Sequence, residues 1–178
     1  MVINQQIELA QKYCKHFHEG QFRKGSNQPY YTHPFAVAEI LARHGYDDPV
    51  TQCIALLHDA VEDSGLRMDQ IQEVFGYEIS NGVYILSRNK GKVLEGQKLT
   101  HDEYMMRLTF ARNKIKRVKI ADTTHNAQDL VNLDLGGIER KIRDSEEFFI
   151  PWGREIAPIM IRELIDNIEN YRRKAEAE

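Results

Sequence analysis

The sequence predicts an all-α protein. Apolar residues recur at spacings of three and four along most of the chain, as they do on one face of an α-helix. Residues that begin or end helices, among them Pro, Gly, Asp and Thr, stand between these periodic segments. No segment shows the alternation of apolar and polar residues that is typical of a half-buried β-strand. These three features favour one compact helical domain over residues 1–178.

The first helix is expected over residues 5–18, where the apolar positions form a single stripe. Residues 20–32 are rich in Gly, Asn and Pro and are expected to form a loop. The second helix is predicted to begin at Pro34, because proline suits the first position of a helix, with His33 at or beside the cap. This helix is expected to end near Gly45.

The third helix has a clear start signal in Pro49, which follows two residues that can cap it, Asp47 and Asp48. Its apolar pattern predicts that it continues to about Asp63. The later helices are expected over residues 69–75, 78–87, 101–112, 114–131, 138–148 and 152–175.

Three features separate these later helices. The polar segment SRNKGKVLEGQK at 87–98 is predicted to be a mobile loop, and Thr100 can cap the helix that follows it. Gly136 and Gly137 are predicted to break the chain before the next helix. The last helix carries an apolar stripe that we assign to core packing, with a homodimer contact as the alternative. The stripe consists of Ile156, Ile159, Met160, Leu164 and Ile165.

Composition excludes several classes of protein. Of the 178 residues, 42% are hydrophobic and 29% charged, as in soluble globular domains. The net charge of −3, without a strongly basic block, argues against a nucleic-acid partner. Two cysteines without a CxxC pair fit a reducing compartment. The N-terminus does not resemble a signal peptide and no apolar run is long enough to cross a membrane, so we expect a cytoplasmic protein.

The segment IALLHDAVEDSG at 54–65 ends an apolar run with His58 and Asp59, and Glu62 and Asp63 follow one helical turn later. On a helix, residues four apart lie on the same face. One interpretation is a solvated acidic face. The other is the floor of a catalytic site, because three neighbouring carboxylates repel one another and a bound cation would relieve that repulsion.

A metal site needs more ligands than the adjacent pair His58 and Asp59. His33, in YYTHP, and Asp122, in VKIADTTHN, are the further candidates, because each lies beside an apolar helical segment that would anchor it to the core. Two histidines and two aspartates, with water in the remaining positions, favour Mn²⁺ or Fe²⁺ over a closed tetrahedral zinc site. Mg²⁺ fits less well because it prefers oxygen ligands.

These motifs occur in an order that resembles the HD-domain metal-dependent phosphohydrolases, and more narrowly the hydrolase domain of RelA/SpoT-type proteins. The similar segments are HFHEGQFRKGSNQPYYTHPFAVAEIL at 16–41, TQCIALLHDAVEDSG at 51–65, IQEVFG at 71–76 and VKIADTTHNAQDL at 118–130. The resemblance covers most of residues 10–131 and implies a family-like core at about 5–150, followed by a C-terminal helix at about 152–175.

The resemblance also implies a reaction, the removal of the 3′-pyrophosphate from guanosine tetra- and pentaphosphate alarmones with a manganese ion. It implies that His33, His58, Asp59 and Asp122 bind the metal, Glu62 and Asp63 activate water, Arg23 and Lys24 contact the nucleotide, Asn126 contacts the nucleoside and His125 shapes its pocket. At 178 residues, the chain is expected to resemble the free-standing small alarmone hydrolases, without synthetase or regulatory domains.

Two segments depart from the family pattern. Thr123 and Thr124 stand where the family usually has Arg or Lys followed by an apolar residue, and LSRNKGK at 86–92 replaces its usual valine-threonine-lysine pattern. Both departures weaken the prediction of the substrate more than the prediction of the metal site. One alternative is therefore an HD phosphohydrolase for another nucleotide, such as a 5′-nucleotide, a dNTP or NADPH. Another is a binding or regulatory module without turnover, against which the intact pair of Glu62 and Asp63 argues.

Overall fold

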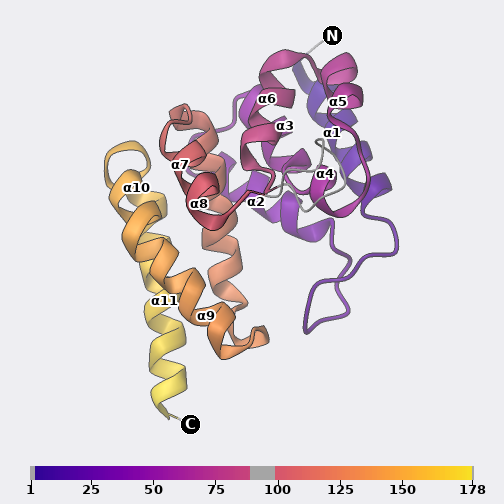
Figure 1. Ribbon diagram of the computed structural model, residues 1–178. Coiled ribbons are helices and arrows are strands. Elements are labelled where there is room, and N and C mark those ends of the chain that lie inside the picture. The colour runs from indigo at the N-terminus through magenta and orange to yellow at the C-terminus, as the bar shows by residue number, and fades with distance from the viewer. Residues whose placement is uncertain (1–2, 89–98, 178) are drawn as a thin grey trace.

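The computed structural model describes residues 3–88 and 99–177, and within these ranges the protein is helical with no β-strand (Figure 1). The fold class predicted from the sequence is therefore confirmed. The α-helices are α1 (Ile3–Phe17), α2 (Thr32–Arg43), α3 (Pro49–Leu57), α4 (Ala60–Asp63), α5 (Met68–Phe75), α6 (Tyr77–Leu86), α7 (His101–Thr109), α8 (Asn113–Gln128), α9 (Leu135–Asp144), α10 (Ile150–Ile156) and α11 (Pro158–Ala177). A 3₁₀ turn, η1 (Leu130–Asn132), and a π-helical turn, η2 (Ser145–Phe149), complete the described elements.

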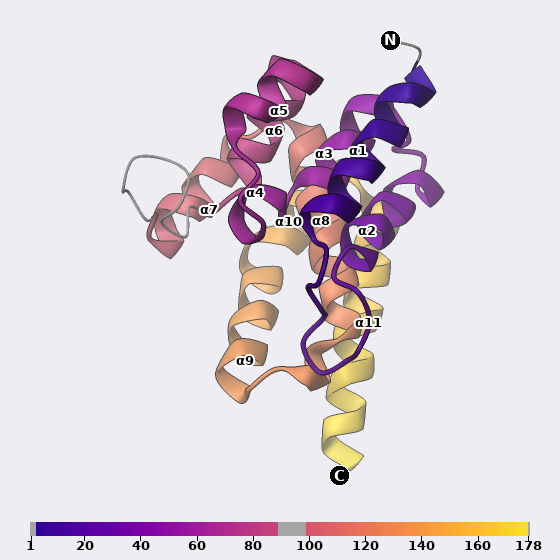
Figure 2. The same ribbon diagram turned by 90° about the vertical axis from the view of Figure 1, so that its right-hand side faces the viewer.

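Helix α8 lies at the centre of the packing and touches α2, α3, α6, α7, α10 and α11. Helix α3 lies against α1, α2 and α6, so α2, α3 and α8 meet in the interior. The long α11 runs beside α8, and the two ends of the chain lie at opposite ends of the molecule (Figures 1 and 2). Of the predicted metal ligands, His33 lies on α2 and Asp122 on α8, while His58 and Asp59 directly follow α3.

Several predicted helix signals are confirmed. Asp48 is the N-cap of α3 and its carboxylate accepts the Thr51 N–H, with Pro49 in the first turn. Thr100 caps α7 in a reciprocal arrangement with Glu103, which satisfies backbone donors that the helix itself leaves free. The predicted loop between α1 and α2 is also found, and an isolated bridge between Phe22 and Pro29 closes it.

The third helix does not run unbroken to Asp63, as predicted. Helix α3 ends at Leu57, and α4 begins at Ala60. Between them, Asp59 adopts φ −99° and ψ −10°, outside the regular helical values. Adjacent residues on an unbroken helix do not face each other. The break therefore lets two neighbouring side chains, His58 and Asp59, turn toward one centre.

The C-terminal half differs from the prediction in three places. The predicted helix over 114–131 ends at Gln128 and is followed by η1. Gly136 and Gly137 lie inside the first turn of α9, because Asp134 caps that helix by accepting the Gly137 N–H. The predicted last helix is divided at Ala157, since a residue before proline disfavours helical angles and α11 starts at Pro158.

The apolar stripe on the last helix is mostly internal. Met160 and Leu164 are fully buried in the core, which confirms their assignment to packing, whereas Ile159 is 67% exposed. Most of the predicted loop at 87–98 lies outside the described residues. Within residues 3–88 and 99–177, no helix combines the length and apolar character needed to cross a membrane.

Gly82 on α6 packs closely against Ile54 on α3. A methyl group on Gly82 would collide with the Ile54 side chain, whereas one on Gly136 would meet only the Asp134 carboxylate at 3.7 Å. We expect Gly82→Ala to lower the free energy of unfolding by about 1–3 kcal/mol through overpacking. Gly136→Ala, the matched control, should leave stability unchanged or raise it by up to about 1 kcal/mol. Urea denaturation of both variants measures the difference, and equal stability would contradict the close packing.

Candidate functional site

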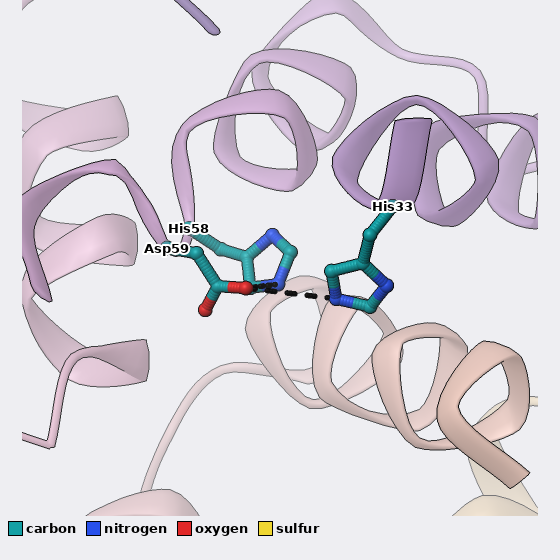
Figure 3. Close-up of side chains that lie close together, drawn as sticks. All are labelled: His33, His58 and Asp59. Atoms are coloured by element: carbon teal, nitrogen blue, oxygen red, sulfur yellow. Dashed lines mark ion pairs between the residues drawn. The ribbon is translucent and has the colours of Figure 1, made fainter. Parts of the chain in front are cut away.

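Four predicted residues from three regions of the chain lie close together where α2, α3 and α8 meet. His33 comes from the first turn of α2, His58 and Asp59 from the break between α3 and α4, and Asp122 from α8. One ligand atom each from His33, His58 and Asp59 lies within 4.8 Å of the other two. Figure 3 shows one Asp59 oxygen facing both imidazoles. The convergence that the sequence suggested is therefore present in space.

Both imidazoles present Nε2 to this centre because their Nδ1 atoms are engaged elsewhere. His58 Nδ1 donates to the Ala55 carbonyl oxygen at 2.6 Å, and His33 Nδ1 lies 2.8 Å from His125 Nδ1. His58 Nε2 is buried and makes no hydrogen bond of acceptable geometry with the described residues. Such second contacts fix the tautomer and ring orientation of metal-binding histidines. A buried, unpartnered nitrogen aimed at carboxylates fits a metal ligand.

The distances also suit a single cation. Asp59 Oδ2 lies 3.2 Å from His58 Nε2 and 3.6 Å from His33 Nε2. Asp122 Oδ1 lies 3.1 Å from His33 Nε2 and 3.8 Å from His58 Nε2. Nitrogen and oxygen ligands lie about 2.0–2.2 Å from a bound transition ion, so two of them can be up to roughly 4 Å apart. The atoms of His33, His58 and Asp59 therefore lie close enough together for one divalent ion, and Asp122 Oδ1, which is near both nitrogens, is a candidate fourth ligand.

Asp122 is held by two neighbours on its own helix. Lys119 Nζ lies 2.7 Å from Oδ2, and Asn126 Nδ2 donates to Oδ1 at 2.5 Å. Burial alone would raise the pKa of Asp122, but the charge of Lys119 and the contacts with His33 and His58 hold it well below its usual range. Lys119 was missed in the sequence, although its spacing of three from Asp122 on a helix was a usable signal.

Before a metal binds, the pKa values of the two histidines are shifted in opposite directions, downward for His33 and upward for His58. Burial lowers the pKa of His33. Burial also opposes protonation of His58, but the negative charges of Asp59 and Asp122 raise its pKa to about 9. Burial and the neighbouring His33 and Arg23 lower the pKa of His125 to about 4. His125 is therefore neutral near pH 7, and its Nδ1 can accept a hydrogen bond from His33 Nδ1–H.

These pKa shifts predict that metal affinity rises with pH. Below pH 9 the metal-free His58 carries a proton on the nitrogen that must bind the ion, so binding releases that proton. The apparent dissociation constant for Mn²⁺ should fall by up to about tenfold for each pH unit between 6.5 and 8.5. Calorimetry in buffers of different ionisation enthalpy measures both affinity and proton release. A dissociation constant that does not change with pH would contradict a protonated His58.

The candidate metal site forms part of a cleft of about 740 Å³, a size that accommodates a small-molecule ligand. His33, Asp59 and Asp122 lie in its wall, and most of the other charged side chains there are basic. The basic residues are Arg23, Lys24, Arg88, Lys119, Arg140 and Lys141. Arg88, Arg140 and Lys141 were not identified from the sequence. Burial lowers the pKa of Lys141 despite the opposing charge of Asp122.

The predicted nucleotide contacts lie in this cleft, with one exception. Arg23 and Lys24 both line it, and Arg23 Nη2 lies 2.8 Å from Asp129 Oδ2 and 3.4 Å from Asn126 Oδ1. Asn126 lines the cleft one turn after Asp122, so it faces the same space. His125 does not line the cleft, and its ring packs on His33 at a centroid distance of 4.9 Å.

Glu62 lies in the cleft beside Asp59 and Lys119. Its Oε1 also accepts the backbone N–H of Arg88, which joins α4 to the segment after α6. The side chain of Asp63 lies outside the described part of the structure, although its backbone forms the end of α4. Of the two acids predicted to activate water, Glu62 is the one whose side chain the structure describes, and it lines the same cleft as Asp59 and Asp122.

The chain is similar to one known protein family, to several curated proteins and to a solved structure. The family described as HD domain matches residues 10–144. A guanosine-3′,5′-bis(diphosphate) 3′-pyrophosphohydrolase of Haemophilus influenzae is 31% identical over 154 residues, which are 85% of this chain and 22% of that protein. A GTP pyrophosphokinase of Streptomyces coelicolor is 35% identical over 153 residues, which are 82% of this chain and 17% of that protein.

These curated relatives are much longer, and the chain spans about a fifth of their length. A solved structure described as a metazoan orthologue of SpoT that hydrolyses ppGpp superposes with a TM-score of 0.79 at 20% identity. That superposition covers 93% of this chain and 95% of the other. At this identity, the likeness establishes the shared fold.

Proposed function

Because this chain belongs to the HD domain family, we propose that it is a metal-dependent phosphohydrolase acting on guanosine 3′,5′-bis(diphosphate) and its pentaphosphate analogue. The reaction would release the 3′-pyrophosphate and leave GDP or GTP. We propose Mn²⁺ as the metal, with Fe²⁺ as the alternative, because the candidate ligands combine imidazole nitrogens with carboxylate oxygens.

The observation that carries this proposal is a metal-ligand cluster in the wall of a basic cleft. A substrate with two diphosphate groups carries several negative charges, and one group must reach the metal while the other is held elsewhere. The basic side chains that line the cleft come from two parts of the fold, Arg23 and Lys24 from the loop before α2 and Arg140 and Lys141 from α9.

A divalent ion at this site supplies Lewis acidity and lowers the pKa of water. The residues of the chain would perform the remaining tasks. Glu62, in the cleft beside Asp59, is placed to take a proton from the attacking water or to orient it, and we assign the same role to Asp63. Arg23 and Lys24 would stabilise negative charge that develops on the phosphoryl oxygens.

The nucleoside end of the substrate would lie against Asn126, with His125 supporting it through His33. Thr123 lies in the cleft wall one turn after Lys119, and its hydroxyl donates to the Lys119 carbonyl oxygen at 2.9 Å. A short threonine stands here in place of the long basic side chain usual in the RelA/SpoT-type pattern. This replacement supports keeping a second candidate, an HD phosphohydrolase for a 5′-nucleotide, a dNTP or NADPH.

A nucleotide panel tests the proposal. The purified chain with Mn²⁺ is incubated with ppGpp, pppGpp, 5′-mononucleotides, dNTPs and NADPH, and the products are separated by ion-exchange chromatography. Pyrophosphate release from ppGpp, with GDP as the second product, is expected. Phosphate release from another nucleotide alone would favour the second candidate. Tight ppGpp binding without cleavage in the presence of Mn²⁺ would instead indicate a regulatory module.

We further propose that residues 1–178 form one domain of a cytoplasmic enzyme whose partner is a nucleotide. The homodimer contact suggested by the last helix would have to use its exposed positions, such as Ile159, because Met160 and Leu164 are buried. Light scattering at increasing protein concentration tests that alternative.

A further inference from the structure

We propose that Tyr30 is a positioning residue for the metal centre, because its hydroxyl orients the Asp59 oxygen that faces both imidazoles. The inference rests on the metal site of the proposed function and does not depend on which nucleotide is the substrate. Tyr30 comes from the loop between α1 and α2, whereas Asp59 comes from the break between α3 and α4.

The contact is directed at the oxygen that would bind the metal. The Tyr30 hydroxyl donates to Asp59 Oδ2 at 2.8 Å. The same oxygen lies 3.2 Å from His58 Nε2 and 3.6 Å from His33 Nε2. A carboxylate oxygen has two lone pairs, so it can accept this hydrogen bond and still bind an ion. The hydroxyl therefore selects which oxygen of Asp59 points to the centre.

Asp59 needs such a contact because its backbone does not belong to a regular helix. At φ −99° and ψ −10° it lies between α3 and α4, and its side chain makes no capping hydrogen bond to α4. Two of the other candidate ligands are held by side chains: His33 by His125, and Asp122 by Lys119. Tyr30 supplies the equivalent support for Asp59.

Tyr30 is itself held from two sides. Its backbone N–H donates to the Gln21 carbonyl oxygen at 2.8 Å. Its ring packs on the His18 ring at a centroid distance of 4.8 Å, and His18 Nδ1 lies 2.8 Å from Gln21 Oε1. His18 is 1% exposed, so the ring on which Tyr30 packs is buried. The ring of Tyr30 also meets His33 edge-on at 6.0 Å.

Through the Tyr30–Asp59 hydrogen bond, the loop between α1 and α2 is linked to the candidate metal site. The loop carries Arg23 and Lys24, which line the cleft, and Tyr30, which contacts a ligand. Fixing Asp59 on an ion would fix Tyr30, and through it the segment that carries the basic pair. Metal binding is therefore expected to order residues 21–30.

The test compares Tyr30→Phe with Tyr31→Phe. Tyr31 is the adjacent tyrosine, but its ring packs on Phe35 at 5.8 Å and lies under the Lys15 ammonium, away from the ligands. Calorimetry with Mn²⁺ should show a dissociation constant about 10–100-fold weaker for Tyr30→Phe, as for other losses of support to a metal ligand, and an unchanged value for Tyr31→Phe. Thermal unfolding of metal-free Tyr30→Phe should give a cooperative transition only a few degrees below that of Tyr31→Phe, because one lost hydrogen bond costs about 1 kcal/mol, so the variant is folded at the temperature of the titration.

Equal Mn²⁺ affinity of the wild type and Tyr30→Phe would overturn the inference, even if the enzyme cleaves ppGpp. Conversely, a weakened Tyr30→Phe in a protein that cleaves another nucleotide would leave the inference intact and overturn the proposed substrate. Hydrogen exchange of the wild type provides a measurement that needs no variant. Amides of residues 21–30 should exchange more slowly after Mn²⁺ is added, and unchanged exchange there would overturn the link between loop and metal.

Discussion

Replacing Asp59 with alanine is expected to abolish both metal binding and turnover. Asp59 Oδ2 lies 3.2 Å from His58 Nε2 and 3.6 Å from His33 Nε2, and Asp59 belongs to the three-residue cluster whose ligand atoms are all mutually close. Without it, two neutral nitrogens and Asp122 remain, and Asp122 is already neutralised by Lys119 at 2.7 Å. We expect Mn²⁺ affinity to fall by more than about 100-fold, which exceeds the usual effect of losing a supporting contact. Phosphohydrolase activity should fall to the background rate.

Asp129→Asn is the matched control for Asp59→Ala. Asp129 also lies in the cleft wall, but its partner is Arg23 at 2.8 Å, and its side chain is 45% exposed. Removal of its charge should leave the Mn²⁺ dissociation constant unchanged while altering the Michaelis constant for the nucleotide. Calorimetry and steady-state kinetics measure the two quantities. If Asp59→Ala retained wild-type Mn²⁺ affinity, the metal centre would have to be placed elsewhere.

Replacing Glu62 with glutamine is expected to have the second large effect, a loss of turnover with the metal retained. Glu62 lies in the cleft beside Asp59 but outside the cluster of close nitrogen and oxygen atoms. Glutamine keeps an oxygen that can accept the backbone N–H of Arg88, so this tertiary contact survives. It cannot accept a proton from water. We expect kcat to fall by about 10²–10⁴-fold, the usual contribution of a general base.

Glu62→Ala serves as the comparison, because it removes both the basic group and the acceptor for Arg88 N–H. It should lose turnover to the same extent and also lower the unfolding midpoint, whereas Glu62→Gln should unfold at the wild-type temperature. Calorimetric titration should give wild-type Mn²⁺ affinity for Glu62→Gln. Turnover by Glu62→Gln at the wild-type rate would remove Glu62 from the chemistry and leave its contact with Arg88 as its role.

Local signals predicted the helices well where a residue acts on its own backbone. Asp48 and Thr100 cap their helices because their side-chain oxygens accept N–H groups three residues on, a contact that needs no distant partner. The local signals predicted a helix boundary wrongly where two local effects compete. Gly136 and Gly137 suggested a break, but the cap at Asp134 outweighed their weak helix propensity.

The candidate site was predictable as a set of residues but not as a geometry. The sequence drew attention to His33, His58, Asp59 and Asp122 because their types suit a metal, and the structure brings these four together. It did not reveal Tyr30 as the donor to Asp59, since that contact joins residues 29 positions apart. Nor did it reveal the contact between His125 and His33. The role of His125 in shaping the nucleoside pocket, which the family resemblance implies, stays a prediction.

By itself the sequence determined the helical class, most helix starts and the chemical identity of the candidate ligands. These features depend on periodicity, capping and side-chain type, which involve only residues close together in the chain. The tertiary structure decided that the helix after Pro49 breaks at His58 and Asp59, and which neighbour supports each ligand. The break opposes the local preference of an apolar helical run. It is stabilised by contacts with α2 and α8 and with the loop bearing Tyr30, so it exists only once those segments are packed together.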